Sequence, residues 1–470
     1  MGMKICPDPT TLLTYFPVWI VPKGSGKRIG RCRLIQGHHP EKQDQHPKNS
    51  GRDPPFFLVM SLWHTAKVTQ NPYLCIMSRI VRFIKGRQGQ WKRMQHVFQD
   101  RESTPPLLWI HCASLGEFEQ GRPVMEAFRK QHPEIQILLT FFSPSGYEIR
   151  KNTPLADQVF YLPLDSPRNA RRFLELVKPT LAVFVKYEFW YYYLKNLKKK
   201  NIPTYLISAR FRPNQPFFKK YGTPFRFMLT CFTHLFVQDE SSRELLENLP
   251  GLSLPVTVAG DTRFDRVAEI ATRDNTPALF RQLVKDPVLV AGSTWPEDED
   301  ILARLMDGHP NLQLVLAPHQ IHAGHLASIR QKFSHLDPVF FSKAQTSTAV
   351  PRVLVIDSIG MLSSLYRYAT YCYIGGGFNK SGIHNTLEAA VYGKPLLFGT
   401  NYHKFKEACD LIDNGAAEGF QDYDSCSRAL KKWMEDPVLY LEAGNAAKTY
   451  VAGNTGATSL MLQKMVVPEP

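Results

Sequence analysis

Short apolar segments alternate with helical segments along most of this chain, and the alternation constrains the fold more than any other feature. Apolar segments of this length, separated by amphipathic helices, are typical of parallel sheets covered by helices on both faces. The predicted strands lie within residues 107–114, 137–146, 158–165, 180–190, 203–210 and 234–239, and then within 288–294, 312–318, 353–357, 369–378 and 395–399. Two such series predict an α/β protein with two Rossmann-like domains.

A tract rich in proline and glycine, residues 250–265, separates the two series. A chain of 470 residues has room for two or three domains, at roughly 150 residues each. We therefore expect an atypical, poorly ordered extension over 1–70, a first Rossmann-like domain with a leading amphipathic helix over 71–255, and a second Rossmann-like domain over 256–470.

The leading helix is predicted over Asn71–Lys85, where Tyr73, Met77 and Ile80 recur at helical spacing beside basic residues. This pattern fits a helix lying on an anionic membrane surface, and it fits a helix packed on the first domain equally well. The earlier apolar segments, 11–21 and 55–63, are far shorter than the roughly 20 residues that a membrane-spanning helix needs.

The formal net charge of +15 is concentrated in residues 79–101, 168–200 and 210–226. A basic face of this kind suits a polyanion. No RNA-binding signature or zinc-finger spacing accompanies the charge, so we expect a membrane or a phosphorylated lipid as partner, and no nucleic acid.

Eight scattered cysteines, without a paired motif, fit reduced thiols in a cytoplasmic compartment. The histidines His319, His322 and His325 lack the spacing of metal ligands. We therefore expect no metal site among them.

The segment Tyr373–Pro395 ends an apolar run with three glycines and continues into a polar loop and a helix that carries one acid, Glu388. Glycines let backbone N–H groups approach a phosphate closely, because they lack a Cβ atom. We expect the helix to begin near Ile383 or His384, to direct its positive end at the anion, and to place Glu388 about one turn further in. The pattern predicts the site of a nucleotide-sugar donor, although a plain strand–helix turn also explains it.

The first domain carries a counterpart in residues 111–123, where a strand leads into Ser114 and Gly116, and Glu117 stands at the start of the next helix. A carboxylate at the carboxyl end of a parallel strand faces the crevice in which such folds bind ligands. There Glu117 is suited to take a proton from an acceptor hydroxyl. An equally good interpretation is that Glu117 only complements the helix dipole.

Taken together, these blocks resemble the 3-deoxy-D-manno-octulosonic acid (Kdo) transferases of lipopolysaccharide synthesis, over roughly residues 86–470. The motifs that carry the resemblance are ASLGEFEQ, FFSPSGYE, DSPRNARRFLELVKP, KYEFWYYYL, SARFR, GDTRFD, AGSTWPEDE, DSIGMLSSLYRYA and GGGFNKSGIHNTLEAA.

This resemblance implies a GT-B fold, in which two Rossmann-like domains face each other across a cleft. It implies transfer of Kdo from CMP-Kdo to the tetraacylated lipid A precursor, lipid IVA, without a metal and with no cofactor beyond the substrate CMP-Kdo. It places the enzyme at the cytoplasmic face of the inner membrane of a Gram-negative cell, on an anionic surface. No motif encodes the number of Kdo units added.

Within this resemblance Glu117 matches the catalytic base. The other expected site residues bind substrate in the first domain and the donor in the second. They are Ser114, Gly116, Glu188, Arg210 and Arg212 in the first domain, and Ser293, Thr294, Gly375, Gly376, Gly377, Lys380, Asn385 and Glu388 in the second.

Chemistry supports these roles, because CMP-Kdo carries one phosphodiester and one carboxylate. Arg210, Arg212 and Lys380 are the cations expected to offset both charges without a divalent ion. We expect inversion through direct displacement, with Glu117 deprotonating the acceptor hydroxyl.

The chain departs from the family pattern at Lys186, where an acid is common, and in the segment 317–322, so that His319 receives no role from the resemblance. An alternative is another GT-B transferase or an epimerase that uses a UDP-sugar. A third possibility is a non-catalytic protein of lipopolysaccharide assembly that kept the fold.

Overall fold

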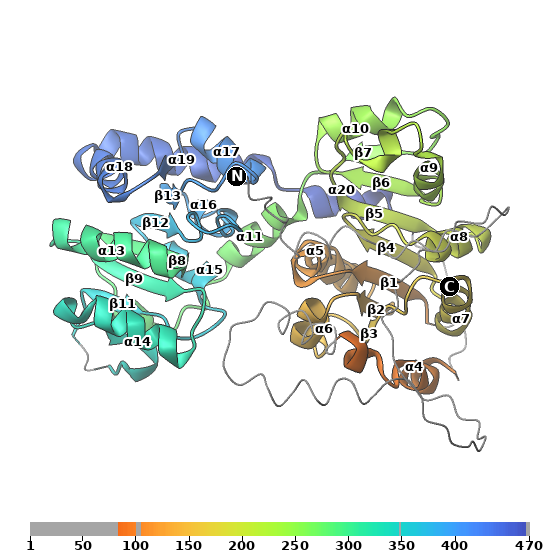
Figure 1. Ribbon diagram of the computed structural model, residues 1–470, viewed down its shortest axis with the longest axis horizontal. Coiled ribbons are helices and arrows are strands. Elements are labelled where there is room, and N and C mark those ends of the chain that lie inside the picture. Colours follow the sequence, from red (N-terminus) through yellow and green to blue (C-terminus); the bar gives the residue numbers. More distant parts are fainter. Residues whose placement is uncertain (1–82, 100–104, 347–348, 467–470) are drawn as a thin grey trace, which may run out of the picture.

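The computed structural model describes residues 83–99, 105–346 and 349–466. Within them, the chain forms two parallel sheets of seven strands each, one in each half of the molecule (Figure 1). The strand orders are β3-β2-β1-β4-β5-β6-β7 and β10-β11-β9-β8-β12-β13-β14. In each sheet the order reverses beside the first strand, and such a switch point leaves a crevice at the carboxyl ends of the two central strands.

The strands of both sheets are short. Those of the first sheet are β1 (Leu107–Cys112), β2 (Gln136–Phe141), β3 (Gln158–Tyr161), β4 (Leu181–Val185), β5 (Thr204–Ala209), β6 (His234–Val237) and β7 (Val256–Val258). Those of the second sheet are β8 (Val288–Thr294), β9 (Gln313–Pro318), β10 (Val339–Phe340), β11 (Val353–Val355), β12 (Tyr371–Ile374), β13 (Leu396–Gly399) and β14 (Ala417–Phe420).

Helices connect these strands and cover both sheets. In the first half they are α4 (Gln90–Phe98), α5 (Leu115–Gln131), α6 (Pro144–Arg150), α7 (Pro167–Val177), α8 (Tyr191–Lys199), α9 (Thr223–Leu229), α10 (Glu240–Glu247) and α11 (Thr262–Thr272). In the second half they are α12 (Ala278–Gln282), α13 (Pro296–Gly308), α14 (Ala323–Lys332), α15 (Leu362–Leu365), α16 (Leu387–Ala390), α17 (Lys406–Asp413), α18 (Tyr423–Glu435), α19 (Pro437–Gly453) and α20 (Ala457–Lys464).

The central strands are apolar on both faces because helices bury both faces of each sheet. Every residue of β1 is buried, and so is every residue of β4. Trp109 and Phe184 belong to the core cluster on one face of the first sheet, and Ile110 and Val183 to the cluster on the other. This alternation follows from strand geometry, in which successive side chains point to opposite faces.

The chain passes between the two domains twice. After β7, α11 leads into the second domain, and after α19 the chain returns, so that α20 packs on the first domain (Figure 1). Met461 and Met465 join the core of the first sheet, and the Val466 N–H donates to the Tyr205 hydroxyl at 2.8 Å. The sequence assigned residues 457–466 to the second domain, whereas Ala457, Met461 and Met465 are buried in the core of the first. The predicted boundary at 255/256 stays a prediction.

The predicted extension over 1–70 and most of the predicted helix Asn71–Lys85 lie outside the described residues. Where the description begins, the Phe83 ring packs edge-on against Phe142, with centroids 5.2 Å apart, and Arg87 donates to the Phe142 carbonyl at 2.6 Å. Among the helices that the structure describes, none combines the length and the apolar character that crossing a bilayer requires.

Candidate active site

Glu117 lies in the first turn of α5, directly after the carboxyl end of β1. Its Oε2 atom accepts hydrogen bonds from the backbone N–H groups of Ala113, at 2.5 Å, and Ser114, at 3.1 Å. These bonds fold the carboxylate back over the end of the strand, as in a helix capping box. Gly116 is exposed beside it, and a Cβ atom there would meet nothing within 4 Å. The predicted residues Ser114, Gly116 and Glu117 therefore share one open turn at the crevice.

Burial, and after it the nearby charge of Glu188, raises the pKa of Glu117 to about 8, although Lys186 and His111 act in the opposite direction. Burial also raises the pKa of Glu188, to about 7. Two carboxyl groups that ionise near neutrality within one crevice are typical of acid–base chemistry. The structure thus brings together two acids that the sequence placed on different motifs.

A buried histidine, His111, joins Glu188 to the interior of the sheet, and the sequence did not single it out. Its Nε2 atom lies 3.1 Å from Glu188 Oε2, and its Nδ1 atom lies 2.9 Å from Thr140 Oγ1. Trp190 Nε1 donates to the same Glu188 oxygen at 2.7 Å. Burial lowers the pKa of His111 to about 3, so the ring is neutral and links Glu188 to Thr140 by hydrogen bonds rather than by charge. The available signal was one polar residue within the otherwise apolar run LLWIHC.

We expect Glu188→Gln to shift the acidic limb of the pH–rate profile to lower pH. The substitution removes the negative charge that raises the pKa of Glu117, so Glu117 loses its proton at lower pH. The expected shift is on the order of one pH unit or less. The exposed Glu175→Gln, which makes the same chemical change on α7, serves as control. A profile that does not move would mean that Glu188 does not act on the titrating group.

The predicted arginines of the first domain lie at the end of β5, where the chain leaves the sheet. Arg210 Nε pairs with Asp239 Oδ2 at 2.9 Å, and Asp239 caps α10. Arg212 is exposed, and its backbone N–H donates to Gln215. Both arginines border a hollow of about 790 Å³ whose apolar wall includes Phe218.

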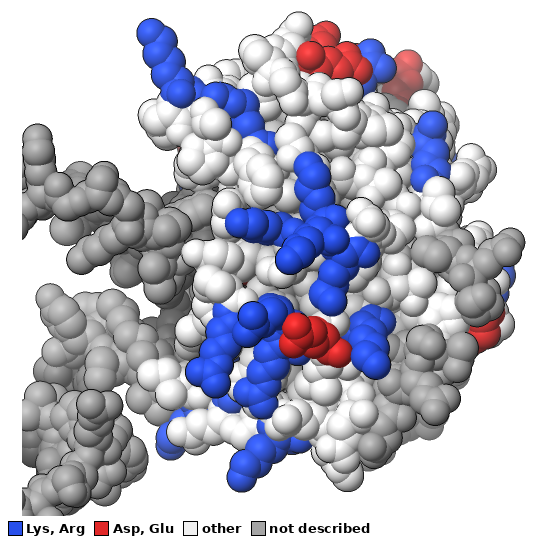
Figure 2. Space-filling view, turned by 90° about the vertical axis from the view of Figure 1, so that its right-hand side faces the viewer, with Lys and Arg blue, Asp and Glu red and all other residues white. Residues whose placement is uncertain are grey.

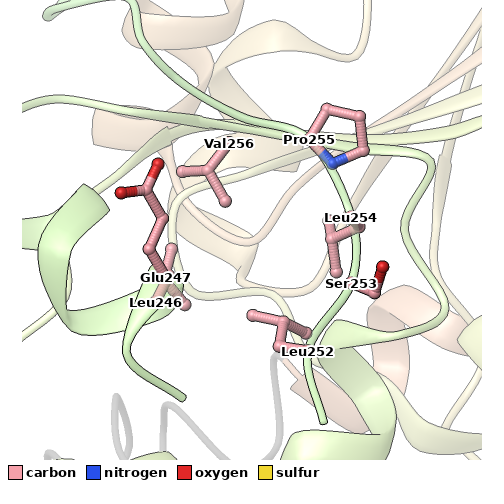
Figure 3. Close-up of a pocket in the computed structure, with 7 residues that line it drawn as sticks. All are labelled: Leu246, Glu247, Leu252, Ser253, Leu254, Pro255 and Val256. Atoms are coloured by element: carbon pink, nitrogen blue, oxygen red, sulfur yellow. The ribbon is translucent and has the colours of Figure 1, made fainter. Parts of the chain in front are cut away.

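A second hollow, of about 390 Å³, lies between the carboxyl end of α10 and the segment 252–256 (Figure 3). Glu247 and Ser253 line it together with five apolar residues, Leu246, Leu252, Leu254, Pro255 and Val256. No predicted site residue borders it, whereas two predicted site residues, Arg210 and Arg212, border the first hollow.

In the second domain, two of the three glycines use their N–H groups within the fold. The Gly375 N–H donates to the Gly292 carbonyl at 2.9 Å, and the Gly376 N–H donates to Asp298 Oδ2 at 2.9 Å. A Cβ atom on Gly377 would lie 2.4 Å from the backbone of Gly399. Close packing of the strand ends therefore explains the glycines, and their role beside a donor phosphate stays a prediction.

The predicted helix start near Ile383 or His384 was wrong. The helix α16 begins at Leu387 and has four residues, so Glu388 lies in its first turn and not one turn further in. The residues before it form a turn, because Asn379 Oδ1 accepts from Gly382 N–H at 3.0 Å and the His384 N–H donates to Gly375. A helix this short offers little dipole for a phosphate.

The candidate donor residues nevertheless surround this turn. Asn385 Nδ2 donates to Glu388 Oε1 at 3.1 Å, and burial raises the pKa of Glu388. Ser293 stands at φ +55° within a bulge between β8 and β9, and Thr294 Oγ1 donates to Glu299 at 3.2 Å. Bulges of this kind commonly re-aim side chains at functional sites. Lys380 is exposed at the edge of the loop.

An aromatic cluster beside this turn was not predicted. The rings of Trp295 and His319 stack with centroids 4.7 Å apart, and His319 lies 4.5 Å from His384. Trp295 Nε1 donates to His384 Nε2 at 3.1 Å, and burial lowers the pKa of His384 to about 4. His325 instead contacts Glu299, 3.0 Å away. Within the described residues, no group of three His, Cys, Asp or Glu side chains is arranged to hold a metal.

The segment that follows β7 ties the two halves together. Asp261 accepts from Gln120 on α5 at 3.2 Å, and Arg263 Nη1 donates to Glu407 on α17 at 2.8 Å. The charge of Glu119 on α5 acts on the pKa of Glu388 in α16, after the larger effects of burial and of Asn385. Glu119, two residues after Glu117 on α5, and Glu388 on α16 therefore lie near each other, although the first domain carries one and the second domain the other.

Comparison with known proteins agrees with this arrangement. A family model described as 3-deoxy-D-manno-octulosonic-acid transferase (kdotransferase) matches residues 88–266. A 3-deoxy-D-manno-octulosonic acid transferase of Haemophilus influenzae is 26% identical over 381 residues, which cover 78% of this chain and 88% of that protein. The protein of the same name from Chlamydophila psittaci is 26% identical over 349 residues, which cover 71% of this chain and 79% of that protein.

Among solved structures, UDP-GlcNAc 2-epimerase from Neisseria meningitidis, bound to UDP-GlcNAc, is similar with a TM-score of 0.54. The identity is 16%, and the match covers 76% of this chain and 98% of that chain. At this identity the likeness shows the fold alone. It confirms the predicted GT-B arrangement of two Rossmann-like domains.

Proposed function

This chain belongs to the 3-deoxy-D-manno-octulosonic acid (Kdo) transferase family and is a glycosyltransferase of lipopolysaccharide synthesis, and we propose that it transfers Kdo from CMP-Kdo to the tetraacylated lipid A precursor. The observation that carries the proposal is Glu117, a carboxyl group at the end of β1 whose pKa burial raises to about 8. A general base works best when its pKa lies near the working pH.

The proposed step is an inverting displacement at the anomeric carbon of Kdo. The acceptor hydroxyl oxygen forms the new bond, its proton passes to Glu117, and the bonding electrons leave with the phosphate oxygen of CMP. Arg210, Arg212 and Lys380 help to offset the negative charge of CMP-Kdo, and Asn385 and Glu388 hold the nucleotide. A monophosphate leaving group does not need Mg²⁺ to bridge a pyrophosphate, so we propose that catalysis is independent of metal.

The test is transfer from CMP-Kdo, generated in situ, to the tetraacylated precursor in the presence of EDTA, with the product measured by mass. The expected product is heavier by one or more Kdo units, and the mass gives their number. In parallel, CMP is expected to raise the thermal midpoint of the protein more than UDP does, because a ligand stabilises the state that binds it. Stabilisation by UDP alone, with no Kdo product, would favour a UDP-sugar enzyme of the same fold.

We also propose that the first domain rests on an anionic membrane surface through α7 and α8. Lysine and arginine side chains gather on this face, which lies at the right of Figure 1 and is turned toward the viewer in Figure 2. The exposed cations on these helices and directly after them are Arg168, Arg171, Lys178, Lys195, Lys198, Lys199 and Lys200.

Replacing Lys195 and Lys199 by Glu is expected to weaken binding to vesicles of anionic lipid. Each cation near such a surface contributes about 1 kcal/mol, so reversal of two charges is expected to cost at least tenfold in partitioning. Sedimentation with vesicles at low and high salt measures the effect. The matched variant, Arg428 and Lys431 to Glu on the exposed face of α18, is expected to bind as the unaltered protein does. An equal loss of vesicle binding in both variants would mean that this face is not the contact with the membrane.

A further inference from the structure

Lys186 is the first residue after β4, at the carboxyl end of a central strand. Its N–H donates to the Ile207 carbonyl at 2.9 Å, which extends the pairing of β4 with β5. The backbone stands at φ +65°, in the left-handed region that a lysine seldom adopts. Residues held in this conformation at a strand end concentrate at functional sites.

Four charged groups lie close enough to act on the Lys186 ammonium. Burial has the largest effect on the pKa of Lys186 and lowers it. The charge of Arg263 also lowers this pKa, and the charges of Asp261, Glu117 and Glu407 raise it. The side chain is half-buried. It therefore stands between the turn of Glu117 in the first domain and the segment that joins the two domains.

Each of these neighbours already has partners. Asp261 accepts from Gln120, Gln238 and Arg263, and Arg263 also reaches Glu407 at 2.8 Å. Glu117 accepts from two backbone N–H groups. Among residues 83–99, 105–346 and 349–466, by contrast, no hydrogen bond or ion pair holds the Lys186 ammonium. A charge that burial takes partly out of water is normally paired, because desolvation is costly otherwise. An unpaired ammonium in a substrate cleft is suited to an anion supplied by the substrate.

We propose that Lys186 binds the carboxylate of the transferred sugar acid, an inference that rests on the proposed function. In Kdo the carboxylate is bonded directly to the anomeric carbon, the atom that the acceptor hydroxyl attacks. Because Glu117 takes the proton of that hydroxyl, the carboxylate lies within a few bonds of Glu117 during the reaction. Lys186 is the unpaired cation found there in the described part of the chain. An ammonium at this point fixes the sugar acid for attack and favours it over a neutral sugar.

The test compares Lys186→Met, which keeps the length of the side chain, with Lys186→Arg, which keeps the charge. A charge-assisted hydrogen bond is worth enough that its loss is expected to raise the KM for CMP-Kdo on the order of tenfold or more. The arginine variant is expected to recover part of the loss. Stabilisation by CMP alone, which lacks the sugar carboxylate, is expected to stay unchanged. Lys431→Met on α18 is the control.

Two results would overturn the proposal. A rise in the KM for the lipid acceptor alone would place an acceptor phosphate on Lys186. A shift of the pH–rate profile with both KM values unchanged would mean that Lys186 acts only on the charge of Glu117. If Lys186→Met does not fold, Lys186→Gln is measured in the same way. Absence of transfer by the unaltered protein would instead count against the proposed function, so the two failures are distinguishable.

Discussion

Glu117→Gln is expected to lower the rate of Kdo transfer by about 10³-fold while stabilisation by CMP remains. The amide keeps the shape of the side chain and can still accept from the Ala113 and Ser114 N–H groups. It cannot take a proton, and general-base catalysis typically contributes 10²–10⁴-fold. The measurement is the initial rate of product formation at saturating substrates, together with the thermal midpoint with and without CMP.

Glu117→Gln is also expected to change how the stability of the protein depends on pH. Burial raises the pKa of Glu117 from 4.5 to about 8. Between these values the unfolded chain has lost the proton and the folded protein keeps it, so the wild-type protein loses stability as the pH rises across this window. Glutamine has no proton to lose. The midpoint of Glu117→Gln relative to wild type is therefore expected to be higher at pH 9 than at pH 6.

The exposed Glu134→Gln, in the loop after α5, is the control and is expected to change neither rate nor midpoint. Transfer at the wild-type rate by Glu117→Gln would remove Glu117 from the role of base. A loss of CMP stabilisation along with the rate would show that the residue supports the donor site and not the proton transfer alone.

The alternation of apolar and helical segments predicted the sheets well, and each strand it named is present. The strands it did not name, β7, β10 and β14, are short and lie at or near the sheet edges. β7 has three residues and follows a proline within the tract that reads as a linker, and β14 contains a glutamate and a glycine. Strands of this kind bury little apolar surface, so periodicity carries almost no signal for them.

The turn of Glu117 was predicted at the right place because its capping pattern is local. The role of the three glycines was harder to predict, since glycines that approach a phosphate and glycines that let strands pack look alike in sequence. The acceptor for the Gly376 N–H is Asp298, far away in the chain, and the partner of Glu188 is His111 on another strand. Such pairs are set by sheet order, which single motifs do not encode.

Asp261→Ala is expected to destabilise the protein by about 3–5 kcal/mol, the cost typical of breaking a buried charge pair. Asp261 is 8% exposed and accepts from Gln120, Gln238 and Arg263. Without its carboxylate, the guanidinium of Arg263 keeps only Glu407, and two glutamine amides lose their acceptor. At roughly 2–4 °C per kcal/mol for a domain of this size, the thermal midpoint is expected to fall by about 6–20 °C.

The ion pair of Asp261 with Arg263 also determines how the stability of the protein depends on pH. Burial alone would raise the pKa of Asp261, but Arg263 lowers it below the usual 3.8. The stabilisation from this pairing is therefore present above pH 4 and is lost as the pH falls through the lowered pKa. Asp261→Ala removes it at every pH, so the difference in midpoint between variant and wild type is expected to be smaller at pH 3 than at pH 7.

The effect on transfer follows from position, because Arg263 joins the first domain to Glu407 of α17 while Asp261 holds Gln120 of α5, the helix that carries Glu117. Loosening this segment is expected to lower the rate of Kdo transfer even at temperatures where the variant stays folded. The reason is that Glu117 and the donor turn are then no longer held at a fixed distance from each other. Asp413→Ala, on the exposed end of α17, is the matched control. If the two variants have the same thermal midpoint and the same rate of transfer, Asp261 does not stabilise the segment that joins the domains.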